Sequence, residues 1–315
     1  MRGRPTRILS LGVVVCWMSA CGPIVPRTAS DSTSTKIPPD ASMTRSAPSA
    51  EAAARDAWHA ERLSRLQAPD GWLTLVGLDF LEEGEFTVGR DASATFSYPG
   101  CADEVIGRFV VVGESVRFVP EPRAEVSIER GTAGEPLVAD DQGPPSVVRS
   151  GTVSFTLVRR NGRLALRVRD AASPVLTEFP GLELYPHDPT RVVEATVEPA
   201  RDRTIAITNV TGFLEEQPLA ATLRFELDGV MRELLATSAG EGRLFVVFGD
   251  ETNGRETYGG GRFLEVPAPI DGRTTIDFNR AYNPPCAFTA FATCPMPPAG
   301  NRLPVRIEAG ERRPQ

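Results

Sequence analysis

Hydrophobic and polar positions divide the chain into one helical stretch and many short alternating runs. The residues of Glu51–Leu66 are helix formers throughout, and Ser49 stands where a side chain would cap the first turn. This pattern predicts a single N-terminal helix. Trp58, Leu63 and Leu66 are the residues that would dock it onto the rest of the protein.

After the helix, short runs rich in β-branched and aromatic residues alternate with Gly, Asp, Pro and Asn. EFTVGR, SVRFV, VSFTLVRR and LALRVRD form one series, and Arg159–Gly162 is a hairpin signal between the last two. A proline-rich segment, Pro174–Pro189, separates them from a second series that runs from RVVEATV to RLFVVFG. We therefore predict a mainly β fold of sandwich-like or barrel-like antiparallel sheets. The helix and a first lobe would occupy residues 51–175, and a second lobe residues 190–315.

The N-terminus has the pattern of a lipoprotein signal. Arg2, Arg4 and Arg7 precede a short apolar stretch that ends in small residues just before Cys21. We expect residues 1–20 to be a signal peptide and Cys21 to be lipidated, with an ordinary secretory signal as the alternative. Residues 21–50 are rich in Ser, Thr, Pro and Ala and would form a disordered tether. The predicted location is the cell envelope, at the periplasmic side of an inner or outer membrane.

Composition excludes several kinds of chemistry. The chain has a formal net charge of −7, which argues against nucleic acid as a partner. Its one lysine, Lys36, lies in the tether, so the folded part can hold neither a Schiff-base lysine nor a phosphate-loop lysine. No dinucleotide fingerprint or HExxH motif occurs, and we predict neither a cofactor nor a metal. Gly259–Gly261 is interpreted as close backbone packing or a bulge.

Histidine is almost as scarce as lysine. His59 lies on the predicted helix beside Trp58, where a solvated or packing role is expected. His187 lies in the proline-rich segment next to Asp188. It is either an acid–base or metal-binding residue or, as we favour, part of a turn that Asp188 begins.

The C-terminal quarter combines Asn, Asp, Tyr, Arg, Gly, Pro and two Cys at high density. Thr252–Gly254 is a hairpin signal, TTIDFNRAY brings Asp277 and Asn279 to one face of a strand end, and NRLPVRIEAGE would supply a last strand. The segment resembles the signature of an uncharacterised bacterial family, the domain of unknown function 1684 family. The resemblance covers the folded part, is specific within residues 250–311, and implies no activity. The matching positions include Gly71–Leu73, Thr257, Tyr258, Gly261–Phe263, Asp277–Asn279, Ala281–Pro284, Cys286, Cys294, Pro295, Asn301 and Ala309–Glu311.

Cysteine usage points to a covalent link in this segment. Cys16 would leave with the signal, which leaves Cys101, Cys286 and Cys294 beside the lipidated residue. A disulfide between Cys286 and Cys294 is the preferred interpretation, with Cys101 as a partly buried free thiol. The alternatives are a metal held by the pair with His187 and a carboxylate, or a nucleophilic Cys286 or Cys294 whose pKa a cation such as Arg262 lowers.

Three roles remain open for the segment. Its polar groups can form a purely structural network, in which Arg262 pairs with Asp277 or Glu311. They can also line a pocket for a small molecule or glycan fragment, or supply Asp277, Glu311 and Asp250 as the carboxylates of a hydrolase. We place a lipid-anchored binding protein first. The predicted ligand-binding residues are Tyr258, Arg262, Asp277, Asn279, Tyr282 and Asn301, with Phe278 as a further wall.

Overall fold

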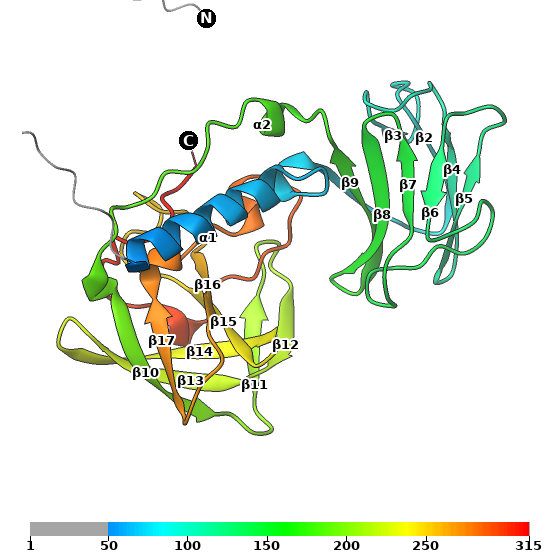
Figure 1. Ribbon diagram of the computed structural model, residues 1–315. Coiled ribbons are helices and arrows are strands. Elements are labelled where there is room, and N and C mark those ends of the chain that lie inside the picture. The colour runs from blue at the N-terminus through cyan, green and yellow to red at the C-terminus, as the bar shows by residue number, and fades with distance from the viewer. Residues whose placement is uncertain (1–49, 315) are drawn as a thin grey trace, which may run out of the picture. The chain divides into compact units, whose positions relative to one another are not determined.

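A computed structural model describes residues 50–314 (Figure 1). The expected signal, the lipidation site Cys21, the tether and the capping residue Ser49 lie outside the described residues. Between residues 50 and 314, no helix has the length and apolar character needed to cross a membrane. The prediction of a mainly β fold with one N-terminal helix and antiparallel sheets is confirmed.

The first group of strands forms two sheets around one core. Alternating apolar positions of the two sheets supply this core, which includes Phe109, Phe118 and Phe155, all almost fully buried. The only parallel pairing described in this group joins β2 and β3. One sheet has the order β1 (Leu75–Phe80), β9 (Arg163–Asp170), β8 (Val153–Arg160), β7 (Val147–Ser150) and β6 (Ser127–Glu129). The other has the order β3 (Phe96–Ser97), β2 (Gly84–Gly89), β4 (Gly107–Val112) and β5 (Ser115–Pro120).

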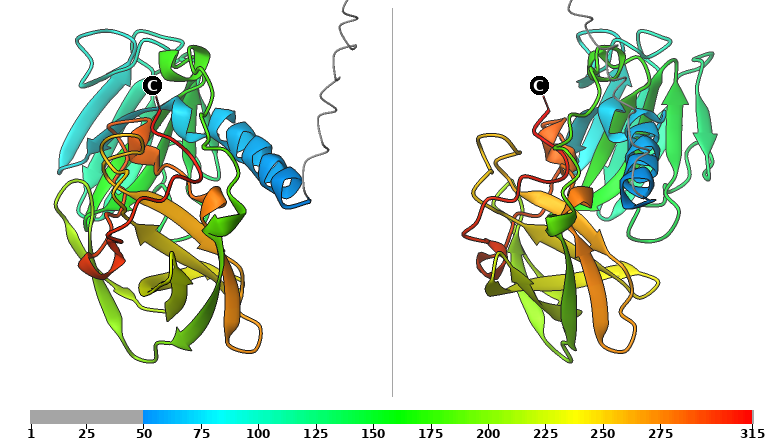
Figure 2. Two further views of the ribbon diagram at one scale, coloured as in Figure 1. Left: turned by 90° about the vertical axis from the view of Figure 1, so that its left-hand side faces the viewer. Right: turned by 60° about the vertical axis from the view of Figure 1, so that its left-hand side comes forward.

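The second group forms a half-barrel around a separate core (Figures 1 and 2). Its inward side chains include Leu223, Phe225, Phe248 and Phe278, each at most 1% exposed. The sheet order is β16 (Arg262–Val266), β15 (Arg243–Phe248), β14 (Val230–Gly240), β13 (Ala221–Leu227), β10 (Val192–Pro199) and β17 (Arg273–Asp277). A small hairpin accompanies it, formed by β11 (Thr204–Thr208) and β12 (Leu214–Pro218).

Local turn chemistry is well predicted where the turn is short. The expected hairpin between β8 and β9 is confirmed, with Asn161 and Gly162 both at positive φ. β15 and β16 also pair, but the strands end at Phe248 and resume at Arg262, so Thr252–Gly254 is one turn of a longer loop. The interpretation of Gly259–Gly261 as close packing fits Gly261. Its φ is +92°, and a Cβ atom there would lie 2.7 Å from the carbonyl oxygen of Phe248.

Two other expectations at the C-terminal end are corrected. β17 ends at Asp277, and Asn279 belongs to the 3₁₀ turn η3 (Phe278–Arg280) instead of the strand. The expected last strand is an irregular segment that contains η5 (Ala299–Asn301) and single bridges from Arg302 to Gly249 and from Glu311 to Leu184. The remaining short elements are η1 (Trp72–Thr74), α2 (Pro174–Thr177), η2 (Pro189–Arg191) and η4 (Pro285–Ala287).

The helix α1 (Ala50–Gln67) packs through one face. Trp58, Arg62 and Leu66 follow each other at four-residue spacing and therefore lie on the same side of the helix. Leu66 is 2% exposed, while most of the opposite face is open to solvent. After the helix the chain turns back so closely that a Cβ atom on Gly71 would clash with the carbonyl of Arg65, 2.6 Å away. This turn brings Trp72 beneath the end of α1.

Candidate functional site

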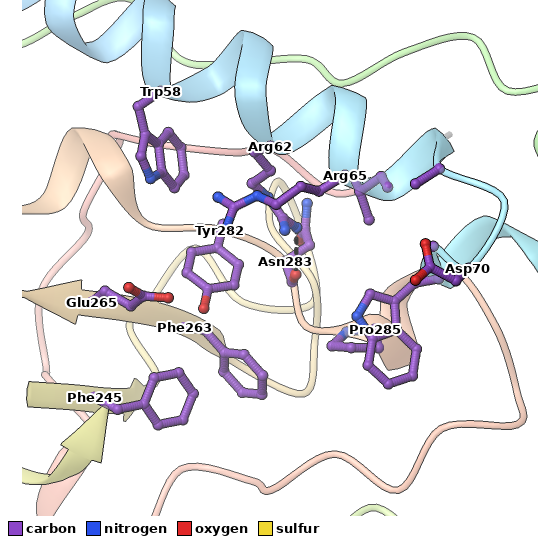
Figure 3. Close-up of a pocket in the computed structure, with 14 residues that line it drawn as sticks. Trp58, Arg62, Arg65, Asp70, Phe245, Phe263, Glu265, Tyr282, Asn283 and Pro285 are labelled. Carbon is purple, nitrogen blue, oxygen red and sulfur yellow. Dashed lines mark hydrogen bonds between the residues drawn. The ribbon is translucent and has the colours of Figure 1, made fainter. Parts of the chain in front are cut away.

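A pocket of about 460 Å³ lies between α1 and the edge of the half-barrel (Figure 3). The helix supplies Trp58, Arg62 and Arg65 to its lining. The turn after the helix adds Trp72, and the opposite side comes from β15, β16 and the segment around Tyr282. This volume falls within the range of small-molecule pockets, about 300–1,000 Å³.

Aromatic rings form one wall of the pocket. The ring centroids of Phe245 and Phe263 are 5.0 Å apart, those of Phe263 and Tyr282 are 5.8 Å apart, and those of Tyr282 and Trp58 are 6.0 Å apart. The first two contacts are edge-to-face, which is a favourable arrangement of aromatic quadrupoles. The backbones of Phe263 and Tyr282 also exchange two hydrogen bonds of 2.9 Å, so the segment after η3 continues the sheet beside β16.

Arg62 closes the top of the pocket. Its Nε donates to Glu311, and its Nη2 donates to the Asn283 carbonyl at 2.8 Å and to Glu311 Oε2 at 3.2 Å. Its guanidinium carbon lies 4.4 Å from the centroid of the Tyr282 ring. The Glu311 side chain is fully buried and also accepts from the Asn283 backbone N–H at 2.8 Å. The contacts of Arg62 therefore hold the helix in place. Arg65, which is 63% exposed, is the positively charged side chain at the edge of the pocket.

Several polar groups of the aromatic wall are free. Within residues 50–314, no hydrogen bond is made by the indole N–H of Trp58, the indole N–H of Trp72 or the hydroxyl of Tyr282. Burial, together with the nearby Glu265 carboxylate, raises the pKa of Tyr282 to about 12. The phenol is therefore neutral at physiological pH and can donate or accept a hydrogen bond. Flat apolar faces with free donors at their edges suit a polar ring-shaped ligand.

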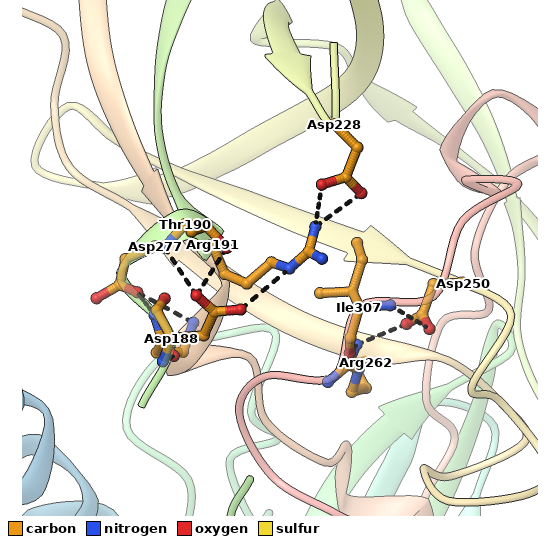
Figure 4. Close-up of polar contacts among 9 residues, drawn as sticks. Asp188, Thr190, Arg191, Asp228, Asp250, Arg262, Asp277 and Ile307 are labelled. Carbon is orange, nitrogen blue, oxygen red and sulfur yellow. Dashed lines mark hydrogen bonds and ion pairs between the residues drawn. The ribbon is translucent and has the colours of Figure 1, made fainter. Parts of the chain in front are cut away.

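Arg262, expected to bind a ligand, is fully buried, and Figure 4 shows it beside Asp250. The expected partners Asp277 and Glu311 are wrong, because its ion pair is with Asp250 at 2.6 Å. The guanidinium also donates to the carbonyls of Ile307, at 2.9 Å, and Ala309. Arg262 lies at the start of β16, directly after the loop that contains Asp250. The ion pair therefore closes this loop and holds the C-terminal segment against it.

Asp277 and Asn279 organise a turn. Asp277 accepts from the backbone N–H and the side-chain amide of Asn279, both at 3.0 Å, and lies 3.3 Å from Arg280. The Asn279 amide exchanges two hydrogen bonds of 2.9 Å with the backbone of Asp188, in the proline-rich segment. Asp277 and Asn279 therefore do not share one face of a strand, as expected, but contact each other through a cap on η3. Asn279 is 1% exposed.

Asn301 and Tyr258 also lie outside the pocket. The Asn301 amide accepts from the Leu235 N–H at 2.7 Å and donates to the carbonyls of Leu235 and Val247 at 2.8 and 2.9 Å. It thus uses its side chain to tie η5 to two strands. Tyr258 is half-buried, and its burial raises the pKa of the phenol. Of the predicted ligand-binding residues, Tyr282 lines this pocket and Asp277 lines a neighbouring hollow.

The predicted catalytic carboxylates all have partners. Asp250 accepts from the Thr252 hydroxyl at 2.6 Å and from its backbone N–H at 2.8 Å, besides Arg262. Glu311 is held by Arg62, and Asp277 caps η3. Asp250 and Glu311 are bound to different arginines and thus belong to different ion pairs. Neither lines the pocket.

Cys286 and Cys294 form a disulfide, as predicted, with Cα atoms 6.0 Å apart. It packs against Phe263 and Leu75 behind the aromatic wall. Cys101 is a free thiol, 4% exposed, and burial raises its pKa to about 11. Among the described residues, no group of three or more His, Cys, Asp and Glu side chains is placed to hold a metal.

The two histidines lie apart from each other. His187 lines a separate hollow of about 500 Å³ with Tyr185, Arg191 and Arg306. Asp188 accepts from the Thr190 N–H at 2.9 Å, which is the turn contact expected beside His187. His59 is half-buried on α1, and burial lowers its pKa. Its Nε2 atom has no hydrogen-bond partner among the residues of the structure's described part.

Several residues of the pocket were not expected from the sequence to form a site, among them Arg62, Trp72 and Phe245. Arg62 had one usable signal, its spacing of four residues from both Trp58 and Leu66. Phe245 had none, because it lies in an ordinary β-rich run, and Trp72 had only its place among the positions that match the family signature. They meet only through the fold.

Comparisons relate part of the chain to known proteins. Residues 177–312 match the family described as "Protein of unknown function (DUF1684)". Among solved structures, the chain is similar to the solution NMR structure of the uncharacterized protein from gene locus rrnAC0354 of Haloarcula marismortui. The two are 37% identical, the match covers 43% of this chain and 78% of that one, and the TM-score is 0.36. A search of the curated proteins found no match.

Proposed function

Because residues 177–312 belong to the DUF1684 family of proteins of unknown function, we propose a function from the pocket itself: the chain binds a small polar molecule with at least one flat face. The observation that supports this most directly is the aromatic wall, whose polar groups remain free. Trp58, Trp72 and Tyr282 each present an apolar ring with an unbonded N–H or O–H to the same 460 Å³ space. A sugar ring or a small heterocycle would use both the faces and the donors.

Binding is favoured over hydrolysis because the candidate catalytic carboxylates already have partners. A carboxylate pair that cleaves a glycosidic bond must face an open cleft, with one member free to give a proton. Here Glu311 and Asp250 are buried in ion pairs with arginines. The pocket has structural arginines and free aromatic edges, which suit recognition.

Intrinsic fluorescence provides a direct test. The chain contains only Trp17, Trp58 and Trp72, and the last two line the pocket. In the full chain with Trp17→Phe, all tryptophan emission therefore comes from the pocket. We expect N-acetylglucosamine, or a molecule found bound to the purified chain by native mass spectrometry, to shift this emission in a saturable way. A chain that carries no bound molecule and shows no saturable shift with the sugar would contradict the proposal.

Matched tyrosine variants then place the ligand. Tyr282→Phe removes one neutral hydrogen bond, which should weaken binding by about 0.5–1.5 kcal/mol. Tyr258→Phe removes a similarly half-buried hydroxyl outside the pocket and should leave affinity unchanged. Equal effects of both variants would mean that the ligand binds elsewhere.

The proposal extends to location. The lipoprotein-type signal supports a binding protein anchored through Cys21, with residues 22–50 as a tether at the surface of an envelope membrane. Cys21→Ser should move the chain from the membrane fraction to the soluble fraction, whereas Cys16→Ser should not. Membrane association that survives Cys21→Ser would contradict lipid anchoring.

A further inference from the structure

A second hollow of about 530 Å³ adjoins the pocket. Trp58 and Glu265 line both spaces, so the two meet at these side chains. The second hollow continues past the end of β16 to Ala268 and reaches Thr275 and Asp277 on β17 and Arg280 on η3. β16 and β17 are the two outermost strands of the six-stranded sheet, and α1 runs past them (Figure 1). The helix therefore covers a longer cleft than the aromatic pocket alone, with Trp58 near its middle.

The charges along this cleft are compensated. In the second hollow, Arg243 pairs with Glu265 at 2.6 Å and Arg280 lies 3.3 Å from Asp277. In the first, Arg62 pairs with Glu311, and Arg65 and Asp70 contribute one charge of each sign. An ionic ligand in the second hollow would have to displace one of the paired side chains, and in the first the opposite charges of Arg65 and Asp70 offset each other. A neutral ligand with many hydroxyl groups would keep the pairs intact and hydrogen-bond to their outer atoms.

A peptide strand fits the cleft less well than a sugar chain. Extended peptides bind by adding a strand to an open sheet edge. Next to the pocket, the edge of β16 is already occupied, because Phe263 exchanges both backbone hydrogen bonds with Tyr282. The groups that remain free there are side-chain donors and the ring faces that Arg62, over Tyr282, and Arg167, over Trp72, do not cover. Sugars stack on such faces through their C–H surfaces and hydrogen-bond at the ring edges.

On this basis, which rests on the proposed function, we propose that the cleft binds a neutral oligosaccharide, with sugar units on both sides of Trp58. Each hollow alone lies within the volume range of about 300–1,000 Å³ that holds one small ligand. A chain of linked sugars would fill both. Once the first sugar unit is bound, the linked second unit is held close to its own hollow. Its binding is then intramolecular, which raises the affinity of the whole ligand without any new type of contact.

The test is a length series. Chito-, cello- and malto-oligosaccharides of one to six units are titrated into the full chain by calorimetry. For the best series, we expect the dissociation constant to fall by at least about tenfold from the monomer to the longer members and then to level off. Trp58→Ala should abolish this gain.

A blocking variant separates the two hollows. Ala268→Trp should fill the second hollow, keeping the affinity for the monosaccharide and removing the gain with length. Ala133→Trp, on an exposed loop of the other core, is the matched control and should change neither. Normal far-UV circular dichroism and a normal melting temperature would show that the variants are folded.

The outcomes distinguish the two proposals. Affinity that is independent of length, or unaffected by Ala268→Trp, overturns the extended site while pocket binding stands. A non-sugar molecule that shifts the Trp58 and Trp72 emission, with no response to any sugar series, overturns the oligosaccharide and keeps the proposed function. Failure of every ligand in both assays overturns both.

Discussion

Arg62 and Glu311, 249 positions apart in the sequence, form an ion pair in which the carboxylate is fully buried. This pair attaches α1 to the C-terminal end of the second core. Arg62 also stacks over Tyr282, so the same side chain both holds the helix and forms the top of the pocket. The contacts of Arg62 that hold the helix thus also form part of the pocket.

The first prediction concerns this pair. Arg62→Ala would leave the Glu311 carboxylate buried without its partner, and we expect a loss of about 3–5 kcal/mol in the free energy of unfolding. Arg65→Ala, one turn along the helix at an exposed position, should change stability by less than about 0.5 kcal/mol. Urea unfolding of both variants checks the difference. A loss below about 1 kcal/mol for Arg62→Ala would mean that the helix is held mainly by Trp58 and Leu66.

The second prediction concerns Arg262 and Asp250. Both side chains are fully buried, so Arg262→Met should cost about 3–5 kcal/mol by leaving Asp250 unpaired. The matched control is Arg243→Met on the adjacent strand, whose pair with Glu265 is about 45% exposed on both sides and should contribute at most about 1 kcal/mol. Urea unfolding again gives the comparison. Similar losses for the two variants would contradict the assignment of Arg262 as a buried structural residue.

Part of the structure around these residues could be predicted from the sequence. The turn at Asn161–Gly162 was predictable, because hairpin geometry depends on a few adjacent residues. The density of polar residues after position 250 correctly indicated an irregular, tightly bonded backbone. Which residues pair there was not predictable, since Arg262 finds Asp250 and Asn301 finds Leu235 only through the complete fold.

The pocket was harder still to predict. Its lining comes from α1, from β15 and β16, and from the segment around Tyr282. These segments are distant from one another in the sequence. Each contributing side chain has a local explanation as a helix or strand residue. Of these side chains, Tyr282 alone was predicted to bind a ligand, because it lies in the C-terminal segment that is rich in polar residues. Sequence periodicity shows which face of an element is buried, but it does not show which two buried faces leave a space between them.

The third prediction concerns the cysteines. The raised pKa of Cys101, about 11, keeps its thiol protonated at neutral pH, and burial hides it. Alkylation of the native protein at pH 7 should therefore modify none of Cys101, Cys286 and Cys294. Denaturation without reductant should expose only Cys101, and reduction should then expose the other two. Mass spectrometry of the alkylated protein counts the sites, and modification of all three before reduction would contradict the disulfide.

The disulfide should also stabilise the wall behind which it packs. Cys286→Ala with Cys294→Ala should lower the free energy of unfolding by about 2–4 kcal/mol, the usual range for a native disulfide. Cys101→Ala is the control, since it removes a cysteine that is not in the disulfide. Because Cys101 is buried, we expect it to lower the free energy of unfolding by a smaller amount, about 1 kcal/mol. Because the bridge contacts Phe263, the double variant should also weaken any ligand measured by Trp58 and Trp72 emission.

The last prediction is a pH dependence. Burial lowers the pKa of His59 below its ordinary value of 6.5, with Arg62 and Arg55 adding to the effect and Glu311 opposing it. Asp56 is the other nearby charge, and it too favours the protonated form. Since the unfolded chain then binds a proton more readily than the folded one, the contribution of this residue to stability is present above pH 6.5 and decreases as the pH falls below it.

His59→Gln should remove this pH-dependent contribution to stability. The decrease in melting temperature between pH 7 and pH 5 should be smaller in the variant than in the parent, while the two should have the same slope between pH 7 and pH 8. A decrease unchanged by His59→Gln would contradict the assignment of this pH dependence to the buried imidazole.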